Sequence, residues 1–536
     1  MVLAIAARAA VDEVVARALV VALCAAVASN VAARGIARRR LAPALSSGAL
    51  VTLAAAAAIA PVAWRVIHGA LEPPPGTAVA RERPDVLLVV LDTTRADHLG
   101  SYGYALPTTP RLDRLAAEGA LFERAYAAAP WTLPSHASLF TGLDVATHGA
   151  TWEHRRLDDR FATIATRLHA LGYATVAVSE NPFIGASTGF ARGFDAFFEM
   201  YGYGRRTVTT RLAEQVARKL EGRHETDGHT EASLETLTGW LAAHRGRGQP
   251  VFAFVNLMAA HLPNYPRAEW PGASYDADDL AELDEMGRLP DRFFIDGKEL
   301  DARQLALLEH FYDGDLHHLD GAVGRLVEWL RRSGHLDRTL LVVTADHGEN
   351  FGDHGFLEHQ YCIYDSLLHV PLLVRYPARV APGTRVAQPV STLDLADTIL
   401  DVVEPGATAR SLLREPRRAA LFAETSRVPL FEVRRALDSE FVAAAYTRFP
   451  EHLESVRLDG YKLIRGSDGS RQLFQIEVDP GETRDLARER PEVVEGLSGL
   501  LDAHASRRAP EPVAVSARIP VDPVAHEVMQ SLGYVR

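Results

Sequence analysis

Two short apolar runs that end on acidic residues constrain the fold of this chain more than any other feature. Residues 85–91 have the sequence DVLLVVL and precede Asp92, and residues 340–343 have the sequence LLVV and lead to Asp346 and His347. Short apolar runs rich in β-branched residues are typical of strands buried in a parallel sheet. Ligands collect at the carboxyl ends of such strands. The pattern therefore predicts an α/β fold in which Asp92, Asp346 and His347 can hold a cation.

Strand-like and helix-like segments alternate along the chain, which predicts βαβ units and a mostly parallel sheet flanked by helices. Beyond residue 419 the segments shorten, which favours a smaller C-terminal subdomain with an antiparallel sheet. The sequence GSDG at residues 466–469 predicts a hairpin there. The predicted strands are residues 85–91, 174–178, 251–257, 339–344, 370–375, 421–424, 441–446, 458–464 and 472–476, and the predicted helices are residues 109–118, 161–171, 232–243, 305–331 and 491–505.

The N-terminal part of the chain has a different character. Residues 18–33 and 42–64 are nearly uncharged, and each approaches the roughly 20 apolar residues that cross a bilayer. The positive-inside rule places the arginine-rich loop at residues 34–40 in the cytoplasm. We therefore expect an N-terminal membrane segment, localisation at the cell membrane, and a catalytic region that is periplasmic or on the cell surface. A cleaved signal peptide, or a helical pair packed on the soluble part, is the alternative.

The length of 536 residues exceeds one ordinary domain. A net charge of −12 argues against a general nucleic-acid binder, so no nucleic-acid partner is expected. The two cysteines, Cys24 and Cys362, lie in different regions, and no internal disulfide is expected. The predicted divisions are a membrane-anchor region at residues 1–70, a Pro-rich linker at 71–83, a catalytic domain at 84–415 and a C-terminal α+β subdomain at 416–536.

A third motif supplies a hydroxyl group. Residues 132–136 have the sequence TLPSH, and Thr141 and Gly142 follow. A loop in front of Thr132 can deliver its hydroxyl to a cation held by Asp92, and metal coordination turns a hydroxyl into a nucleophile near neutral pH. The simpler interpretation of Asp92 is that it caps the next helix.

Together these motifs resemble the sulfatase family of the alkaline phosphatase superfamily over residues 83–536. They share the family's order and approximate spacing with further pieces, namely NLMAAHLP at 256–263, GDHG at 352–355, VPL at 370–372, YKLI at 461–464 and DPGE at 479–482. The resemblance implies a sulfatase-like fold. It also implies that one divalent ion is held by Asp92, Thr132, Asp346 and His347, and that His136, His261 and His359 take part in catalysis.

The departures from the family pattern bear on the chemistry. Sulfatases carry Cys or Ser at the position of Thr132, where it is oxidised to formylglycine, and Arg at the position of His136. Oxidation of a threonine would give a ketone rather than an aldehyde, so no formylglycine is expected. Thr132 itself is then the expected covalent nucleophile. In this respect the chain is similar to phosphodiesterase and phosphotransferase members of the superfamily.

The ligand set also departs from that of calcium-type sulfatases. Thr93 stands where these usually have a second carboxylate, and His347 stands where they generally have Asn. Two carboxylates, an imidazole and a hydroxyl favour Zn²⁺ or Mn²⁺, with Ca²⁺ or Mg²⁺ as alternatives. His261 and His359 can stabilise the developing charge and protonate the leaving oxygen, whereas His136 can also orient the nucleophile.

Two further positions have two interpretations each. Asp313 and His317 share one helical face and could hold a second metal, but a solvated stripe on an amphipathic surface helix is favoured. Asn181 either contacts substrate or belongs to a turn before Pro182.

The pattern as a whole predicts a metal-dependent hydrolase of phosphate (or sulfate) esters with Thr132 as its nucleophile. Its substrate would be a small-molecule, glycan or lipid ester. The sequence of loops such as residues 265–303 does not indicate which of these classes binds. One alternative is a membrane-anchored phosphoryl-group transferase that acts on a lipid or glycan. The other is a non-catalytic anchored binding protein of the same fold.

Overall fold

The computed structural model describes most of the chain beyond residue 82. The described residues are 83–202, 229–244, 248–262, 264, 267, 269–270, 279, 300–408, 410–415, 417–426 and 450–506. Within them, no helix combines the length and the apolar character that a membrane span requires. The two expected membrane segments, at residues 18–33 and 42–64, lie outside the described residues.

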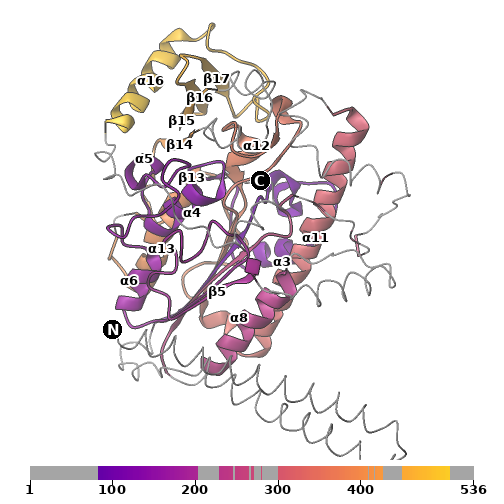
Figure 1. Cartoon of the computed structure of the whole chain (residues 1–536), viewed down its shortest axis with the longest axis vertical. Coiled ribbons are helices and arrows are strands. Elements are labelled where there is room, and N and C mark those ends of the chain that lie inside the picture. Colours follow the sequence, from indigo (N-terminus) through magenta and orange to yellow (C-terminus); the bar gives the residue numbers. More distant parts are fainter. Residues whose placement is uncertain are drawn as a thin grey trace, which may run out of the picture. The chain divides into compact units, whose positions relative to one another are not determined.

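The described residues contain an eight-stranded sheet with the strand order β12-β2-β11-β7-β1-β6-β4-β5 (Figure 1). Its central strands pair in parallel, with Val86 of β1 opposite both Phe252 of β6 and Leu340 of β7. The strand β11 runs antiparallel to its two neighbours. The expected mostly parallel sheet is therefore confirmed. The strands are β1 (Asp85–Leu91), β2 (Ala120–Phe122), β4 (Ala174–Ser179), β5 (Ala196–Glu199), β6 (Val251–Leu257), β7 (Thr339–Thr344), β11 (Leu372–Arg375) and β12 (Thr384–Val386).

Helices cover both faces of this sheet, because alternate residues of each strand point to opposite sides. On one side Leu87 and Val89 of β1 join a core built with α3, α8 and α11, and on the other side Leu88 and Val90 join a core built with α4, α6 and α13. Both faces of β1 are thus buried, which explains its uninterrupted apolar sequence. The helices are α3 (Pro110–Ala117), α4 (Thr132–Thr141), α5 (Val145–His148), α6 (Ile164–Ala170), α8 (Thr230–His244), α11 (Ala302–Arg332), α12 (Asp365–Leu368) and α13 (Leu395–Val403), with 3-10 turns at Ala96–His98, Gly100–Tyr102, Met200–Gly202, Leu336–Arg338, Asp353–Gly355 and Thr392–Asp394.

The strand expected at residues 370–375 is divided into two. β10 (His369–Val370) pairs with β3 (Ala125–Tyr126), whereas β11 pairs with β7 in the large sheet. Pro371 separates them, and a proline has no N–H to donate to a sheet ladder. The remaining short strands are β8 (Asn350–Phe351), β9 (Leu357–Glu358) and β13 (Val390–Ser391).

A four-stranded antiparallel sheet forms the C-terminal part, with α16 (Pro491–Ala505) packed on it (Figure 1). The expected hairpin at residues 466–469 is confirmed. The single strand expected at 458–464 is wrong, because Asp459 and Gly460 have positive φ values and form a tight turn between two strands. The strand expected at 441–446 lies outside the described residues. The four strands are β14 (Leu421–Ser426), β15 (His452–Leu458), β16 (Tyr461–Gly466) and β17 (Arg471–Gln475).

Buried ion pairs join this C-terminal sheet to the large domain. The Asp365 carboxylate at the start of α12 accepts from Arg457 at 2.6 Å and from Lys462 at 2.8 Å. Lys462 is 1% exposed and also pairs with Glu482 at 2.7 Å. Removal of one partner from such a buried set leaves an uncompensated charge. These ion pairs therefore fix the position of the C-terminal sheet on the large domain.

Candidate active site

Four neighbouring parallel strands end at one place and bring polar side chains together there. In the sheet order β7-β1-β6-β4, Asp346 and His347 follow β7, Asp92 follows β1, and Asn181 follows β4. Asn256 lies near the end of β6. All five side chains are fully buried. The cluster occupies the carboxyl edge of the sheet, where α/β proteins bind their ligands.

Asp92, Asp346 and His347 form a group whose ligand atoms lie within 4.8 Å of one another. The His347 Nδ1 donates to the Gly348 carbonyl at 2.8 Å, so Nε2 carries no proton in the neutral ring. This unprotonated nitrogen lies 3.3 Å from Asp346 Oδ2 and 3.9 Å from Asp92 Oδ1. Within the described part of the chain, neither of these two oxygens has a hydrogen-bond partner.

Three buried acceptors that face one another without a donor between them suit a divalent cation. The electrostatics point the same way. Burial, together with the charge on Asp92, raises the pKa of Asp346 well above its ordinary value. Burial also opposes ionisation of Asp92, but the imidazoles of His261 and His347 outweigh it and lower the pKa of Asp92. A cation among these groups would let both carboxylates ionise.

Thr132 is the first residue of α4, and its hydroxyl faces this group. Its Oγ1 lies 3.4 Å from His347 Nε2 and accepts a hydrogen bond from Asn181 Nδ2 at 3.2 Å. The ten-residue helix α4 directs its positive N-terminal end at the same place. The hydroxyl is thus positioned by two side chains and placed where negative charge is favoured.

His136 lies one helical turn beyond Thr132 in α4. Its Nδ1 donates to the Thr132 carbonyl at 3.0 Å and lies 3.4 Å from Asp346 Oδ2. The ring packs edge-on against Phe190 and Phe254. Burial lowers the pKa of His136 to about 4, so the ring is neutral near pH 7. His136 therefore links the backbone of Thr132 to the Asp346 carboxylate.

His359 lies between His347 and His261, with its ring tilted against the first and edge-on to the second. The His359 ring centre is 4.4 Å from that of His347 and 5.1 Å from that of His261. His261 Nδ1 donates to the Leu262 carbonyl at 2.6 Å. Burial lowers the pKa of both rings, that of His359 to about 4. The structure thus brings all seven residues predicted from the sequence into one site.

Sequence reasoning gave no role to Glu349 or Asn256, and it did not foresee the contacts that Asn181 makes. Glu349 holds His359, whose Nδ1 is 3.2 Å from both Glu349 carboxylate oxygens, and burial raises the pKa of Glu349 to about 8. Asn256 Nδ2 donates to Asp92 Oδ2 at 3.1 Å, and Asn181 Nδ2 donates to the same oxygen at 2.9 Å. Glu349 could have been found as the last residue of the DHGE motif, and Asn256 as the polar residue inside an apolar strand. Asn181 belongs to the expected turn, since its Oδ1 accepts from Phe183 N, while its contact with substrate stays a prediction.

Backbone strain surrounds the cluster. Thr93, Glu358 and Gln360 have φ values of 54°, 59° and 94°, which is rare for residues other than glycine. Tyr312 of α11 fixes the first of these, because its hydroxyl donates to the Thr93 carbonyl at 2.9 Å and accepts from Arg95 N at 2.8 Å. Strain of this kind persists only where the surroundings determine it, and it gathers at functional sites.

The second metal site is not assembled. Asp313 accepts from Tyr104 at 2.7 Å and lies 2.8 Å from His98 Nδ1, while His317 Nδ1 lies 3.3 Å from the Thr108 carbonyl. The expected solvated stripe is also wrong at Asp313, which is 2% exposed and held in a buried network. The helix packs over the sheet, and its acidic residues bind neighbouring segments.

Comparison with known proteins gives consistent matches. Residues 84–405 match the family model described as Sulfatase, and residues 352–502 match that described as N-sulphoglucosamine sulphohydrolase, C-terminal. A sulfatase of Formosa agariphila is 24% identical over 439 residues, which is 75% of this chain and 82% of the relative. An arylsulfatase of Clostridium perfringens is 25% identical over 370 residues, or 60% of this chain and 74% of the relative. The phosphonate monoester hydrolase of Agrobacterium radiobacter has a similar fold, with a TM-score of 0.59, 21% identity, and coverage of 80% of this chain and 96% of that one.

Proposed function

Because the chain belongs to the sulfatase family of ester hydrolases, we propose that it cleaves phosphate or phosphonate esters with Thr132 as a covalent nucleophile. The observation that carries the proposal is the position of the Thr132 hydroxyl between Asn181 Nδ2 and His347 Nε2. A threonine at this position has no route to formylglycine. The side chain that remains can attack through its own oxygen.

The proposed reaction has two displacements. Thr132 Oγ1 attacks the phosphorus atom of the substrate, and the bond between phosphorus and the leaving oxygen breaks. The threonine then carries the phosphoryl group, and a proton passes to the leaving alcohol. Water then attacks the phosphothreonine and restores the hydroxyl. His261 and His359 face this position and can exchange the proton, while Asn181 and His136 hold the threonine in place. Glu349 fixes the orientation of His359.

Asp92, Asp346 and His347 are the residues that would hold a divalent cation, with Thr132 as a fourth ligand. When bound, the cation would lower the pKa of a hydroxyl and stabilise negative charge on the substrate. Two carboxylates and one imidazole favour Zn²⁺ or Mn²⁺, with Ca²⁺ or Mg²⁺ as alternatives. Elemental analysis of the purified protein tests this assignment, and a stoichiometric ion of another kind would revise it.

The test of the reaction uses a panel of aryl phosphate monoesters, phosphodiesters, phosphonate monoesters and sulfate esters. Thr132→Ala should abolish turnover, and the matched variant Thr132→Ser should retain part of it because the oxygen stays. Substrate trapped at low pH should leave a phosphoryl mass on the peptide that contains Thr132. Preferential hydrolysis of sulfate esters by the natural protein would overturn the proposal.

We also propose that the catalytic part lies outside the cytoplasm behind an N-terminal membrane anchor. The support is the sequence, in which two apolar segments flank the arginine-rich loop at residues 34–40. A paired-reporter fusion after Gly76 tests the topology. Activity of the cytoplasmic reporter alone would contradict it.

A further inference from the structure

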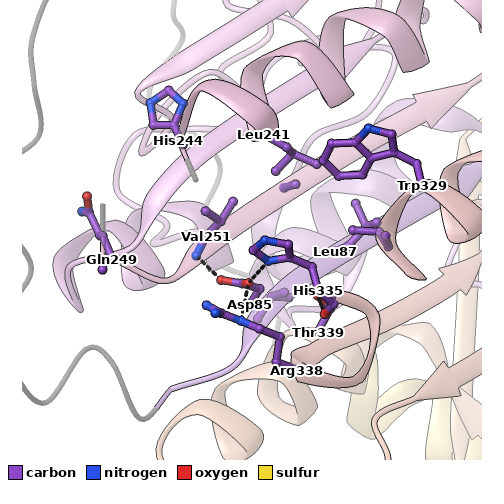
Figure 2. Close-up of a pocket in the computed structure, with 14 residues that line it drawn as sticks. Asp85, Leu87, Leu241, His244, Gln249, Val251, Trp329, His335, Arg338 and Thr339 are labelled. Atoms are coloured by element: carbon purple, nitrogen blue, oxygen red, sulfur yellow. Dashed lines mark hydrogen bonds and ion pairs between the residues drawn. The ribbon is translucent and has the colours of Figure 1, made fainter. Parts of the chain in front are cut away.

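A cavity of about 260 Å³ lies at the amino ends of β1, β6 and β7 (Figure 2). Asp85, the first residue of β1, lines it, whereas Asp92 follows the last residue of the same strand. Seven extended residues at about 3.3 Å each span about 20 Å. The cavity is therefore at the opposite edge of the sheet from the ester-cleaving cluster and is not an extension of it.

The walls of the cavity are mostly apolar. The sheet contributes Leu87 and Ala253, α8 contributes Leu241, and α11 contributes Trp329 and Leu330. Figure 2 shows the Trp329 indole beside Leu241, with Asp85, His335 and Arg338 grouped below them and His244 and Gln249 apart on the left. An apolar cavity of about 150 Å³ accommodates benzene. This one has room for a ring with a short chain, about ten non-hydrogen atoms in all.

The polar side of the cavity presents donors. The Asp85 carboxylate already accepts from Val251 N at 2.9 Å and from Arg338 Nε at 3.0 Å, and it lies 3.4 Å from His335 Nδ1. The acid is thus satisfied by its neighbours. The groups that remain for a ligand include the terminal N–H groups of Arg338 and the Nε2 of His335, and Gln249 adds one acceptor, its Oε1. The Arg338 side chain is 55% exposed, which places its guanidinium at the mouth.

We propose that this cavity binds a small aromatic carboxylate, with the ring against Trp329 and Leu241 and the carboxylate at Arg338. A planar guanidinium offers paired N–H groups that match the two oxygens of a carboxylate. The apolar walls select for a ring, and the donors at the mouth select for the anion. The inference does not depend on the proposed ester hydrolysis.

The test is a titration of the full chain with 3-phenylpropionate, followed by ligand-observed NMR. Its neutral and cationic counterparts, 3-phenylpropan-1-ol and 3-phenylpropylamine, should bind progressively more weakly. Leu241→Trp fills the cavity and should abolish binding of the acid. Arg338→Gln should weaken it about fivefold, because an exposed ion pair contributes modestly. The matched control Arg332→Gln removes the same charge from a side chain that is 72% exposed and outside the cavity, and should leave binding unchanged.

Three results would overturn the proposal. The first is absence of binding up to about 10 mM acid, which is also the result if this chain's own residues or a second copy fill the cavity. The second is unchanged binding by a Leu241→Trp variant whose circular dichroism matches that of the natural protein. The third is binding of the ammonium compound as tightly as the acid.

Discussion

Asn181→Ala provides the sharpest test of how the site positions its nucleophile. The Asn181 amide donates one hydrogen to Asp92 Oδ2 at 2.9 Å and the other to Thr132 Oγ1 at 3.2 Å. The variant removes both donors while leaving the threonine and the carboxylate in the chain. Asn256→Ala is its matched control, because Asn256 donates to the same Asp92 oxygen but has no hydrogen bond to Thr132 among the described residues.

The expected loss follows from these two bonds. A hydrogen bond to a charged group contributes about 1.5–3 kcal/mol, and one between neutral groups about 0.5–1.5 kcal/mol. Loss of both amounts to about 2–4 kcal/mol, which corresponds to a decrease of about 30- to 1000-fold in kcat/KM. Asn256→Ala loses only the charged bond, so the ratio between the two variants should be about two- to tenfold.

The assay is steady-state hydrolysis of an aryl phosphonate or phosphate ester, with bound metal and melting temperature measured on the same preparations. The prediction requires both variants to fold and to retain metal. A change of less than twofold in Asn181→Ala would refute the reasoning. Equal activity of the two variants would show that the bond to Thr132 does not position the nucleophile.

Three further outcomes are expected. His347→Ala should lose bound metal and activity together, whereas His317→Ala should keep both, as measured by elemental analysis. Burial raises the pKa of Asp320 to about 6, so its contribution to stability is present below about pH 4 and is lost as the pH rises through about 6. Asp320→Asn should therefore gain about 2.5 kcal/mol relative to the natural protein between pH 4 and pH 7, and an equal difference at both pH values in denaturation would contradict this. Asp365→Ala should cost about 3–5 kcal/mol in denaturant unfolding, because buried Arg457 loses its carboxylate partner and buried Lys462 keeps only Glu482.

The central strands could be predicted from the sequence because their physical cause is local. The central strands at residues 85–91, 251–257 and 339–344 are buried on both faces, and their mostly apolar sequences indicate this. The break at Pro371 and the turn at Asp459 and Gly460 could not be predicted from periodicity, because each depends on one or two residues inside an otherwise strand-like segment. The short strand β12 carries too few residues for a pattern to appear.

The residues of the site also fall into those that the sequence predicts and those that only the fold brings together. Asp92, Asp346 and His347 come together because each follows a strand of the same sheet, and strand ends are visible in the sequence. The role of each as a metal ligand stays a prediction. Asn256 and Glu349 became apparent only from the structure, since their partners, Asp92 and His359, are distant in the sequence or lie across a turn. The burial of Asp313 depends on how a long helix packs, which its own periodicity does not contain.

Thr93 has a consequence for how this enzyme could be altered. A buried β-branched residue at a φ of 54° lowers the free energy of unfolding by about 1–3 kcal/mol. Glycine would relieve it, but the hydroxyl that donates to the Asp92 carbonyl at 2.8 Å would disappear. Laboratory selection for heat resistance alone should therefore enrich substitutions at Thr93 in its early rounds. The selected variants would be more stable but would hold Asp92 less firmly. Such a selection should therefore include an assay of turnover from its first round.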